Sequence, residues 1–416
     1  MTGSIRATPL GAAFDLLAAY EAPGGAFFER EGSGVATGSL ADALRAGPAP
    51  DLRSLAREVS AALRDLTASD RVAPVAIGAL PFAIGALPFA GGPSSLFVPR
   101  RAVIRRDDGE TWLVDLADPG EEPPSFRPER VIGDLPHEAF RPRQLSEEPP
   151  SEAYARAVAD AVERIGASDL EKVVLARTVR VDAGRDLDAR RLLHRLRAVE
   201  PHCYTFAAPT EGGTLVGASP ELLLSRRGDR VRSTPLAGTA PRSGDPDEDR
   251  ANAEALVASA KDREEHAIVV DAVSEVLGAS CDELTFDDEP VLEPTANVWH
   301  LATRFEGALR DPSLTALDLL AELHPTPAVC GTPERLARVS IAELEGFDRG
   351  EYAGPVGWVD ARGDGDWAIA LRCAELSGEE ATLYAGAGIV AGSDPALELD
   401  ETDRKFRAFL DSLRWG

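Results

Sequence analysis

The chain has very little lysine. Lys172, Lys261 and Lys405 are its only lysines among 416 residues, although lysine and arginine together number 44. A guanidinium stays protonated at any accessible pH, whereas a lysine amine can be tuned to lose its proton. Because arginine supplies almost every other positive charge, we expect the three lysines to occupy positions with a specific chemical task.

The chain also has few cysteines and no net positive charge. The four cysteines, Cys203, Cys281, Cys330 and Cys373, are far apart and have no metal-ligand spacing, so we expect reduced thiols in a cytoplasmic protein. The formal net charge of −26 argues against nucleic acid or an anionic membrane as a partner. An anionic substrate would therefore need a local pocket of positive charge.

Long uninterrupted apolar runs are missing. The first 20 residues have no basic start followed by an apolar core, so no signal peptide is predicted. Residues 72–99 carry no charge, but glycine and proline interrupt them too often for a membrane-spanning helix. This stretch repeats Ala-Ile-Gly-Ala-Leu-Pro-Phe at 76–82 and 83–89. We predict a buried strand followed by a turn that the second copy lengthens.

Composition and periodicity favour a mixed fold. Hydrophobic content of 44% and charged content of 27% are typical of a globular protein. We predict an N-terminal part over residues 1–145, a Pro- and Glu-rich surface connection over 118–150, and a catalytic region over 150–416, together forming one compact body.

Helical and strand periodicities alternate along the chain. The predicted helices cover 52–66, 151–165 (with Ser151 as N-cap), 186–199, 248–277, 313–323 and 397–413. The predicted strands cover 172–181, 204–208, 214–217, 222–225, 354–360, 366–376 and 381–390. This order indicates an α+β (mixed α/β) protein built on large sheets.

From about residue 150 onward, nearly every turn carries a glycine or polar cluster. The clusters are Gly217-Ala-Ser-Pro-Glu221, Pro235-Leu-Ala-Gly-Thr239, Lys261-Asp-Arg-Glu-Glu-His266, His300-Leu-Ala-Thr303, Leu323-His-Pro-Thr-Pro-Ala-Val-Cys-Gly331, Phe347-Asp-Arg-Gly-Glu-Tyr-Ala-Gly-Pro-Val-Gly-Trp358, Arg372-Cys373, Tyr384-Ala-Gly-Ala-Gly-Ile-Val390 and Glu398 to Lys405. In order and content they resemble the chorismate-utilising enzymes. This family includes isochorismate synthases, salicylate synthases, and the large subunits of anthranilate and aminodeoxychorismate synthases.

The resemblance covers residues 150–413; the N-terminal third matches the family mainly through the Leu-Pro-Phe element. It implies large antiparallel-rich sheets in a sandwich-like core with helices packed outside, as in the anthranilate synthase large subunit. It also implies a reaction in which water adds at C2 of the chorismate ring and the C4 hydroxyl leaves.

Two residues match the family's catalytic acid and base. Lys172 resembles the base that activates the water, and Glu221 resembles the acid that protonates the departing hydroxyl. A neutral lysine and a protonated glutamate both require shifted pKa values. One desolvated pocket can serve both, because burial lowers the pKa of an amine and raises that of a carboxyl.

Chorismate carries two carboxylates, so this acidic chain must supply cations and backbone donors. Arg372 suits a carboxylate because its planar fork can donate two hydrogen bonds, and Lys405 adds a second positive charge. Gly386 and Gly388 let a ligand approach the backbone closely. The resemblance adds further pocket residues: Gly238, Thr239, His300 beside the departing C4 oxygen, Ala328, Val329, Tyr352 and Tyr384.

The resemblance also implies a magnesium site. The family's two metal-binding glutamates fall here on Glu265 and Glu401. Mg²⁺ is commonly held by one or two carboxylates plus substrate oxygens and waters, so two glutamates from distant segments are a plausible protein contribution.

Three positions distinguish the members of the family. Amine-using members carry glutamine where this chain has Lys172, and aminodeoxychorismate synthases often carry lysine where it has Ala237. Salicylate synthases tend to carry a different, threonine-containing segment where it has Ala328 and Val329. These residues indicate an isochorismate synthase, an isomerase. The alternatives are salicylate synthase and, less favoured, an anthranilate or aminodeoxychorismate synthase large subunit.

A different class of function is a catalytically silent relative that only binds an anionic metabolite. The joint presence of Lys172, Glu221, Glu265 and Glu401 argues against it. We expect a monomer that needs no glutamine amidotransferase. The stretch 327–333 is similar to siderophore-pathway enzymes, but the sequence leaves open whether siderophore, menaquinone or salicylate synthesis uses the product.

Overall fold

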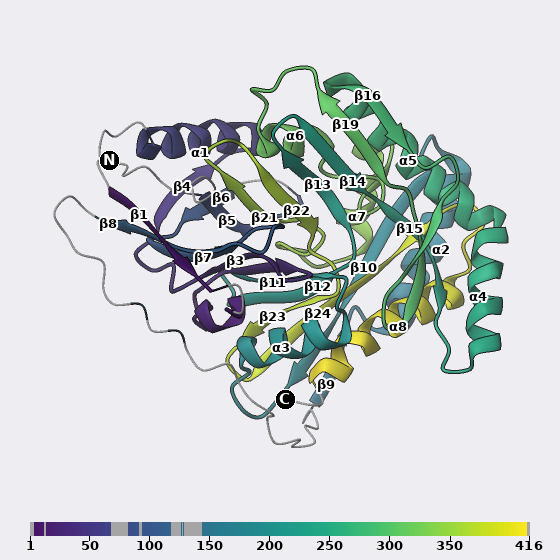
Figure 1. Cartoon of the computed structure of the whole chain (residues 1–416). Helices are drawn as coiled ribbons and strands as arrows, with labels where there is room; N and C mark the ends of the chain where they lie inside the picture. The colour runs from purple at the N-terminus through teal and green to yellow at the C-terminus, as the bar shows by residue number, and fades with distance from the viewer. Residues whose placement is uncertain are drawn as a thin grey trace.

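The computed structural model describes residues 4–11, 14–67, 82–90, 94–117, 126, 128 and 144–413. Two large β-sheets face each other, and helices cover their outer sides (Figure 1). Every strand pairing in the described part of the chain is antiparallel. This architecture confirms the predicted α+β class with a sandwich-like core.

The larger sheet runs, in spatial order, β1 (Ser4–Leu10), β8 (Thr111–Ala117), β7 (Arg101–Arg105), β3 (Ser33–Thr37), β2 (Phe27–Arg30), β11 (Tyr204–Pro209), β12 (Thr214–Ser219), β23 (Cys373–Ser377), β24 (Glu380–Ile389), β10 (Lys172–Asp182) and β20 (Gly331–Thr332). In addition, β9 (Gln144–Glu148) pairs with β10.

The second sheet runs β16 (Cys281–Phe286), β19 (Phe305–Leu309), β14 (Arg230–Thr234), β13 (Leu222–Arg227), β22 (Gly365–Ile369), β21 (Pro355–Asp360), β5 (Phe82–Ala86), β6 (Ser94–Val98) and β4 (Leu44–Ala49). A small third sheet is formed by β15 (Leu236–Pro241), β18 (Val298–Ala302) and β17 (Val291–Pro294).

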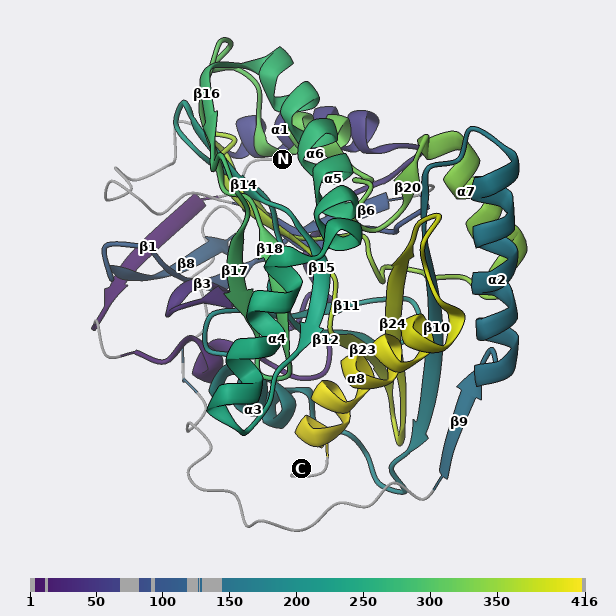
Figure 2. The ribbon, with the colours of Figure 1, turned by 90° about the vertical axis from the view of Figure 1, so that its right-hand side faces the viewer.

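The helices are η1 (Leu16–Ala19, a 3-10 turn), α1 (Leu52–Thr67), α2 (Ser151–Ala167), α3 (Ala189–Val199), α4 (Pro246–Ala258), α5 (Ala260–Ser280), α6 (Ala316–Leu323), α7 (Glu334–Leu344) and α8 (Pro395–Leu413). Figure 2 shows α2 running along β10 and α8 lying across β24 and β10. The core between the two large sheets is apolar and includes Leu175 and Phe206 from one sheet and Leu224 and Trp367 from the other.

Strands from the N-terminal third and from the later region share both large sheets: β2 pairs with β11, and β5 pairs with β21. The division at residues 145–150 stays a prediction.

The predicted strand in the repeat is corrected in one respect. The second copy does not lengthen a turn, because its first residues lie in β5, and Leu87 and Phe89 are buried. Most of the first copy lies outside the described residues.

Two long predicted elements are each broken in the structure. The helix predicted over 248–277 is two helices, because Ser259 ends α4 and its side chain caps α5 by accepting from the backbone N–H of Asp262. The strand predicted over 366–376 stops at Ile369 and resumes at Cys373. Arg372 lies between them with φ of +48°, a conformation that a strand cannot include.

Ser151 is not the N-cap of α2. Pro150 holds that position, and Ser151 is the first helical residue, with its hydroxyl and its backbone N–H both donating to Glu147. The prediction failed because a serine preceded by proline can enter the helix once another side chain satisfies its N–H group.

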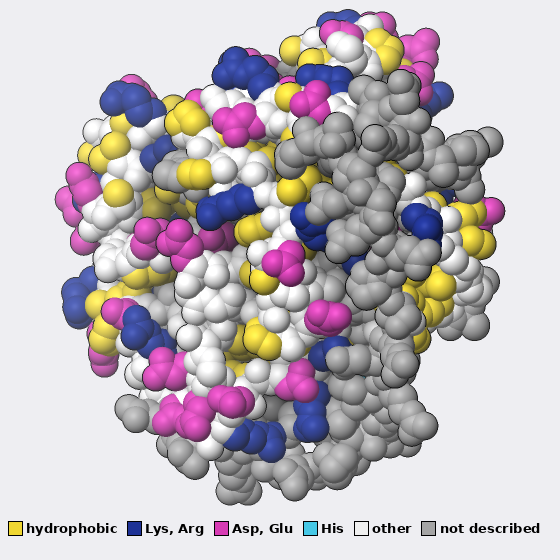
Figure 3. All heavy atoms as spheres, turned by 90° about the vertical axis from the view of Figure 1, so that its left-hand side faces the viewer, with side chains coloured by type: hydrophobic (Ala, Val, Ile, Leu, Met, Phe, Trp, Pro, Cys, Tyr) yellow, Lys and Arg dark blue, Asp and Glu magenta, His cyan; other side chains and the backbone are white. Residues whose placement is uncertain are grey.

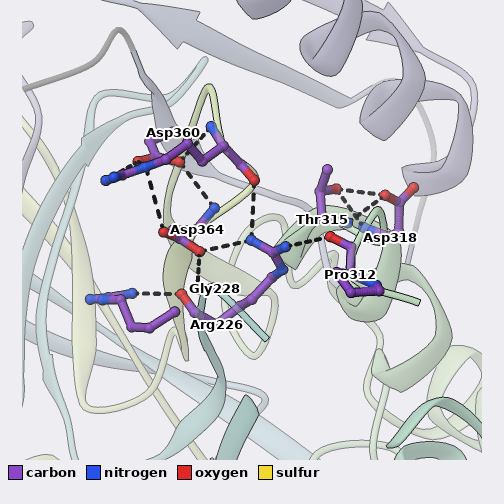
Figure 4. A network of polar contacts seen from close by, with 9 residues as sticks. Arg226, Gly228, Pro312, Thr315, Asp318, Asp360 and Asp364 are labelled. Atoms are coloured by element: carbon purple, nitrogen blue, oxygen red, sulfur yellow. Dashed lines mark hydrogen bonds and ion pairs between the residues drawn. The ribbon is translucent and has the colours of Figure 1, made fainter. Parts of the chain in front are cut away.

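A buried polar network ties the β21–β22 turn to β13. We call it the Arg226 network; its members include Arg226, Gly228, Pro312, Asp360, Arg362 and Asp364 (Figure 4). Arg226 Nη1 donates to Asp364 Oδ1 at 2.7 Å, and Arg226 Nη2 donates to the Pro312 carbonyl at 2.8 Å. The Gly228 N–H donates to the same Asp364 oxygen at 2.6 Å. The network holds the β21–β22 turn against β13 and against Pro312, which lies just before α6.

Acidic and basic side chains are interspersed on the face shown in Figure 3. No helix within the described residues is long and apolar enough to cross a membrane.

Candidate active site

A cavity opens between β24, β15, α5 and α8. Every predicted substrate and metal residue lines it, namely Gly238, Thr239, Glu265, His300, Ala328, Val329, Tyr352, Arg372, Tyr384, Gly386, Gly388, Glu401 and Lys405, together with Glu221. Lys172 is not in the lining. It lies behind Glu265 with none of its side chain exposed. The structure therefore brings the predicted residues of distant segments together, although their roles stay predictions.

Lys172 begins β10 and pairs with Glu265 of α5. The two side chains form an ion pair in which Lys172 Nζ lies 3.0 Å from Glu265 Oε1, and the buried amine has no hydrogen-bond partner in the described residues. Gly388 of β24 lies beside this pair. A Cβ at position 388 would come within 2.1 Å of Glu265 Oε1 and 3.1 Å of Lys172 Cε. Glycine is required there because the carboxylate occupies the space of a side chain.

Glu221 lies in the connection between β12 and β13 and is 2% exposed. Burial raises the pKa of Glu221 to about 8, although a backbone donor at Leu236 and the charges of Lys172 and Lys405 act to lower it. Its Oε1 has no hydrogen-bond partner within the described part of the chain. At neutral pH the carboxyl therefore mainly keeps its proton, as a general acid requires.

His300 and Arg372 form a hydrogen-bonded pair over the bulge of β15. Thr239 lies opposite His300 in the β15–β18 pairing, and Gly238 beside it has φ of +78°. His300 Nδ1 lies 3.3 Å from the Gly238 carbonyl, and Arg372 Nη2 lies 2.9 Å from His300 Nε2. These partners assign the Nδ1–H tautomer, with Nε2 accepting from the guanidinium.

Two properties of this pair bear on ligand binding. Burial, followed by the charges of Arg372 and Lys405, holds the pKa of His300 well below its usual range, so the ring is neutral. Arg372 Nη1 is buried without a hydrogen-bond partner among the described residues. A buried guanidinium donor without an acceptor suits a bound carboxylate.

α8 contributes the carboxylate and the ammonium on the other side of the cavity. Lys405 Nζ donates to Glu401 Oε1 at 2.6 Å and to the Gly386 carbonyl of β24 at 2.7 Å. One turn earlier in α8, Glu398 Oε1 accepts a hydrogen bond from Lys261 Nζ of α5 at 2.6 Å. Burial and then the Glu401 charge raise the pKa of Glu398, while Lys261 acts to lower it. Each of the three lysines therefore pairs with a glutamate in or beside this site.

Two tyrosines form an aromatic wall. Tyr352 and Tyr384 stack with their ring centroids 5.0 Å apart and an interplanar angle of 13°. His324 has its Nε2 3.3 Å from the Phe89 carbonyl, and burial lowers its pKa to about 3.

Sequence reasoning missed Arg349, which also lines the cavity. It is 4% exposed and pairs with Glu345 through two of its nitrogens. Its terminal nitrogens also donate to the carbonyls of Val329 and Val174, both at 2.8 Å. Arg349 thus joins the small apolar lining at Val329 to β10, the strand of Lys172. The Phe347–Trp358 cluster contained this residue, but one arginine among many gave no signal of its burial.

Glu265 and Glu401 offer oxygen ligands for a divalent cation. Their carboxylates enter the same cavity from two helices, and a lysine nitrogen lies 3.0 Å from Glu265 and 2.6 Å from Glu401. In the described residues, no three His, Cys, Asp or Glu side chains are placed to hold a metal ion together. Mg²⁺ fits such a donor set, because it prefers oxygen ligands and completes its coordination with waters and substrate oxygens.

A larger open cleft of about 930 Å³ lies on the other side of Pro220. None of the predicted site residues lines it. Its charged groups largely pair with one another, as Arg227 does with Asp366 and Arg304 with Asp287. We therefore assign the chemistry to the smaller cavity.

Comparison with known proteins identifies the family. Residues 94–414 match the family model described as chorismate binding enzyme. The isochorismate synthase DhbC of Bacillus subtilis (strain 168) is 47% identical over 272 residues, which are 64% of this chain and 68% of the relative.

Two solved structures resemble the fold. A putative 2,3-dihydroxybenzoate-specific isochorismate synthase, DhbC from Bacillus anthracis, has a TM-score of 0.82 at 36% identity and covers 96% of this chain and 99% of its own. Anthranilate synthase component I from Streptococcus pneumoniae TIGR4 has a TM-score of 0.68 at 22% identity over 97% of this chain and 92% of its own, a likeness of fold alone. Since the family match spans most of the chain and includes the whole cavity, the chain belongs to the chorismate binding enzyme family.

Proposed function

We propose that the chain is an isochorismate synthase, an isomerase that converts chorismate into isochorismate. The observation that carries the proposal is that Glu221 lines one buried cavity and that Lys172 lies directly behind Glu265, which lines the same cavity. Lys172 offers an amine without a hydrogen-bond partner among the described residues, and Glu221 offers a carboxyl whose pKa burial raises to about 8. These are the base and the acid that the reaction needs.

The two residues act on opposite ends of the same rearrangement. The Lys172 amine accepts a proton from water as the water oxygen forms its bond to C2 of the ring. Both ring double bonds shift by one position and the C4–O bond breaks as Glu221 gives its proton to the leaving oxygen. Lys172 ends protonated and Glu221 ionised, so proton exchange with solvent restores both. General acid and base steps of this kind each contribute about 10²- to 10⁴-fold.

Substrate positioning falls to the cations of the cavity. Arg372 has a free buried Nη1 for a carboxylate, and Lys405 supplies a second positive charge. Neutral His300 accepts from Arg372 at Nε2 and so holds the guanidinium in place. Water rather than ammonia is the nucleophile, because Lys172 and Ala237 stand where amine-using relatives carry glutamine or lysine.

We further propose that Mg²⁺ is the cofactor and that Glu265 and Glu401 hold it. When bound, the ion would offset the negative charge of a substrate carboxylate. The cytoplasmic location, the monomeric state and the independence from an amidotransferase stay predictions.

Product analysis tests the proposed function. The purified protein is incubated with chorismate and Mg²⁺, and chorismate, isochorismate, salicylate and pyruvate are followed by chromatography. We expect isochorismate without pyruvate, and no dependence on ammonium. Stoichiometric pyruvate with salicylate would assign the chain to the salicylate synthases, and a product that requires ammonium would assign it to the aminating members.

A further inference from the structure

Arg177 is a fully buried arginine to which the proposed chemistry gives no task. It lies on β10, five residues after Lys172, and none of its side chain is exposed. Its Nε donates to Thr402 Oγ1 at 2.8 Å, and its Nη2 pairs with Asp403. The guanidinium also lies 5.0 Å from the ring centroid of Phe406. All three of these partners belong to α8.

These partners are neighbours of the cavity residues on the same helix. Adjacent residues of an α-helix are about 100° apart around its axis. Glu401 and Lys405 therefore share the strip that faces the cavity, and Thr402 and Phe406 share the next strip, which faces Arg177. A contact that fixes the second strip also fixes the direction in which the first strip points.

Another contact that anchors α8 is made by Lys405, which donates to the Gly386 carbonyl. Lys405 is itself assigned to the substrate, so its contacts are expected to change when a ligand binds. The contacts of Arg177 lie outside the cavity and do not need to change. On its other side Arg177 reaches Ser151 Oγ of α2 at 3.4 Å, so it joins β10, α2 and α8.

We propose that Arg177 is a positioning residue that sets the rotation of α8 and thereby the placement of Glu401 opposite Glu265. The inference rests on the proposed function, because it assumes that these two carboxylates bind Mg²⁺. A rotation of α8 by about 20° would move a side-chain tip about 6 Å from the helix axis by about 2 Å. Mg²⁺ requires near-ideal octahedral geometry with bonds of about 2.0–2.1 Å, so even part of such a rotation would weaken the bond from Glu401.

The test uses Thr402→Val, which keeps the shape of the side chain and removes the oxygen that accepts from Arg177 Nε. Mg²⁺ is titrated calorimetrically into the full-length protein with an unreactive chorismate analogue present. We expect the dissociation constant for Mg²⁺ to rise about tenfold, equivalent to about 1.4 kcal/mol. The kcat at saturating Mg²⁺ and chorismate should stay near the wild-type value, because neither Lys172 nor Glu221 has changed.

Asp364→Asn in the Arg226 network is the matched control. It weakens a buried arginine contact far from the cavity, so it should lower the melting temperature without changing the affinity for Mg²⁺. Asp403→Asn, at a half-exposed partner of Arg177, covers the case in which Thr402→Val does not fold. It should raise the dissociation constant about threefold, by about 0.7 kcal/mol.

The outcomes separate the inference from the proposed function. If the wild type binds Mg²⁺ and both α8 variants bind it equally well, Arg177 is only a structural residue and the inference is overturned. If the Asp364→Asn control weakens Mg²⁺ binding as much as Thr402→Val does, the weaker binding reflects a loss of stability. That result also overturns the inference. If the wild type itself binds no Mg²⁺, the proposed cofactor is wrong, and the inference falls with it.

Discussion

The molecule contains two buried polar regions that differ in how completely their groups are hydrogen-bonded. In the Arg226 network, both terminal nitrogens of Arg226 donate to protein oxygens and Asp364 accepts from two donors, and Arg226 Nε is the one buried network atom without a partner in the described residues. In and beside the cavity, Lys172 Nζ, Glu221 Oε1 and Arg372 Nη1 are all buried without hydrogen-bond partners in the described residues. A mostly hydrogen-bonded network stabilises a fold, whereas buried groups without hydrogen-bond partners cost stability. The difference marks the cavity as the place where a ligand completes the bonding.

The largest expected effect comes from the base. Lys172→Arg and Lys172→Ala should lower kcat to a similar extent, by about 10³- to 10⁴-fold, because a guanidinium cannot accept the proton of the water. The measurement is kcat for both variants under saturating chorismate and Mg²⁺. Substantial activity in the arginine variant alone would show that Lys172 is an electrostatic anchor like the charges of the Arg226 network.

Removing a metal carboxylate should have the next largest effect. Glu265→Gln or Glu401→Gln takes one charge from the proposed pair of Mg²⁺-binding carboxylates, so turnover should fall by about 10³-fold and Mg²⁺ binding should weaken strongly. Calorimetric titration with a chorismate analogue measures the binding, and circular dichroism serves as the check on folding. Metal affinity equal to wild type in both variants would mean that the ligands are misassigned.

A smaller effect is expected from pH. The pKa of Glu221 is raised to about 8, so kcat/KM should fall about tenfold per pH unit above that value as the acid loses its proton. A profile that stays flat to pH 10 would exclude Glu221 as the acid.

The same pKa predicts a dependence of stability on pH. The folded carboxyl holds its proton more tightly than the unfolded one, whose ordinary value is 4.5. The contribution of Glu221 to stability is therefore fully present below about pH 4.5, declines as pH rises to about 8, and is constant above it. Thermal melts of Glu221→Gln should lack this decline and show higher stability than wild type at neutral pH, while activity is lost. Parallel melting curves for the two proteins from pH 5 to 9 would contradict the raised pKa.

The smallest effect on activity is expected in the Arg226 network. Asp364→Asn should lower the free energy of unfolding by about 1–3 kcal/mol, because it weakens a buried charged hydrogen bond, and kcat should not change. Denaturant unfolding and a steady-state assay measure the two quantities. A loss of kcat without a loss of stability would mean that the two polar regions are coupled.

The site was largely predictable from the sequence because its residues occur in dense, ordered motifs. Glu221, Arg372 and Lys405 could be named from the clusters that contain them, and the structure places all three around one cavity. Their pKa values could not be predicted, because the raised pKa of Glu221 depends on burial by segments far away in the sequence. Arg349 and Arg177 were missed for the same reason: their partners are carbonyls and side chains of distant elements.

The fold class was predictable from the sequence, but the points at which helices and strands are interrupted were not. Ser259 interrupts a helical pattern without a glycine or proline, so periodicity alone runs through it. The positive φ of Arg372 interrupts a strand pattern in the same way, and non-glycine residues in that region are uncommon enough to merit a functional explanation. Here the break turns the side chain that holds His300 toward the cavity.

The pairing of β5 with β21 sets the order in which the chain can assemble. On one side, residues 82–86 pair with residues 356–360, so the ribosome has released most of the polypeptide before this part of the sheet can close. Pairings of such long sequence separation slow folding and leave strand edges open to association in the meantime. The yield of soluble protein during synthesis should therefore depend on chaperones more than the melting temperature of the finished enzyme would suggest.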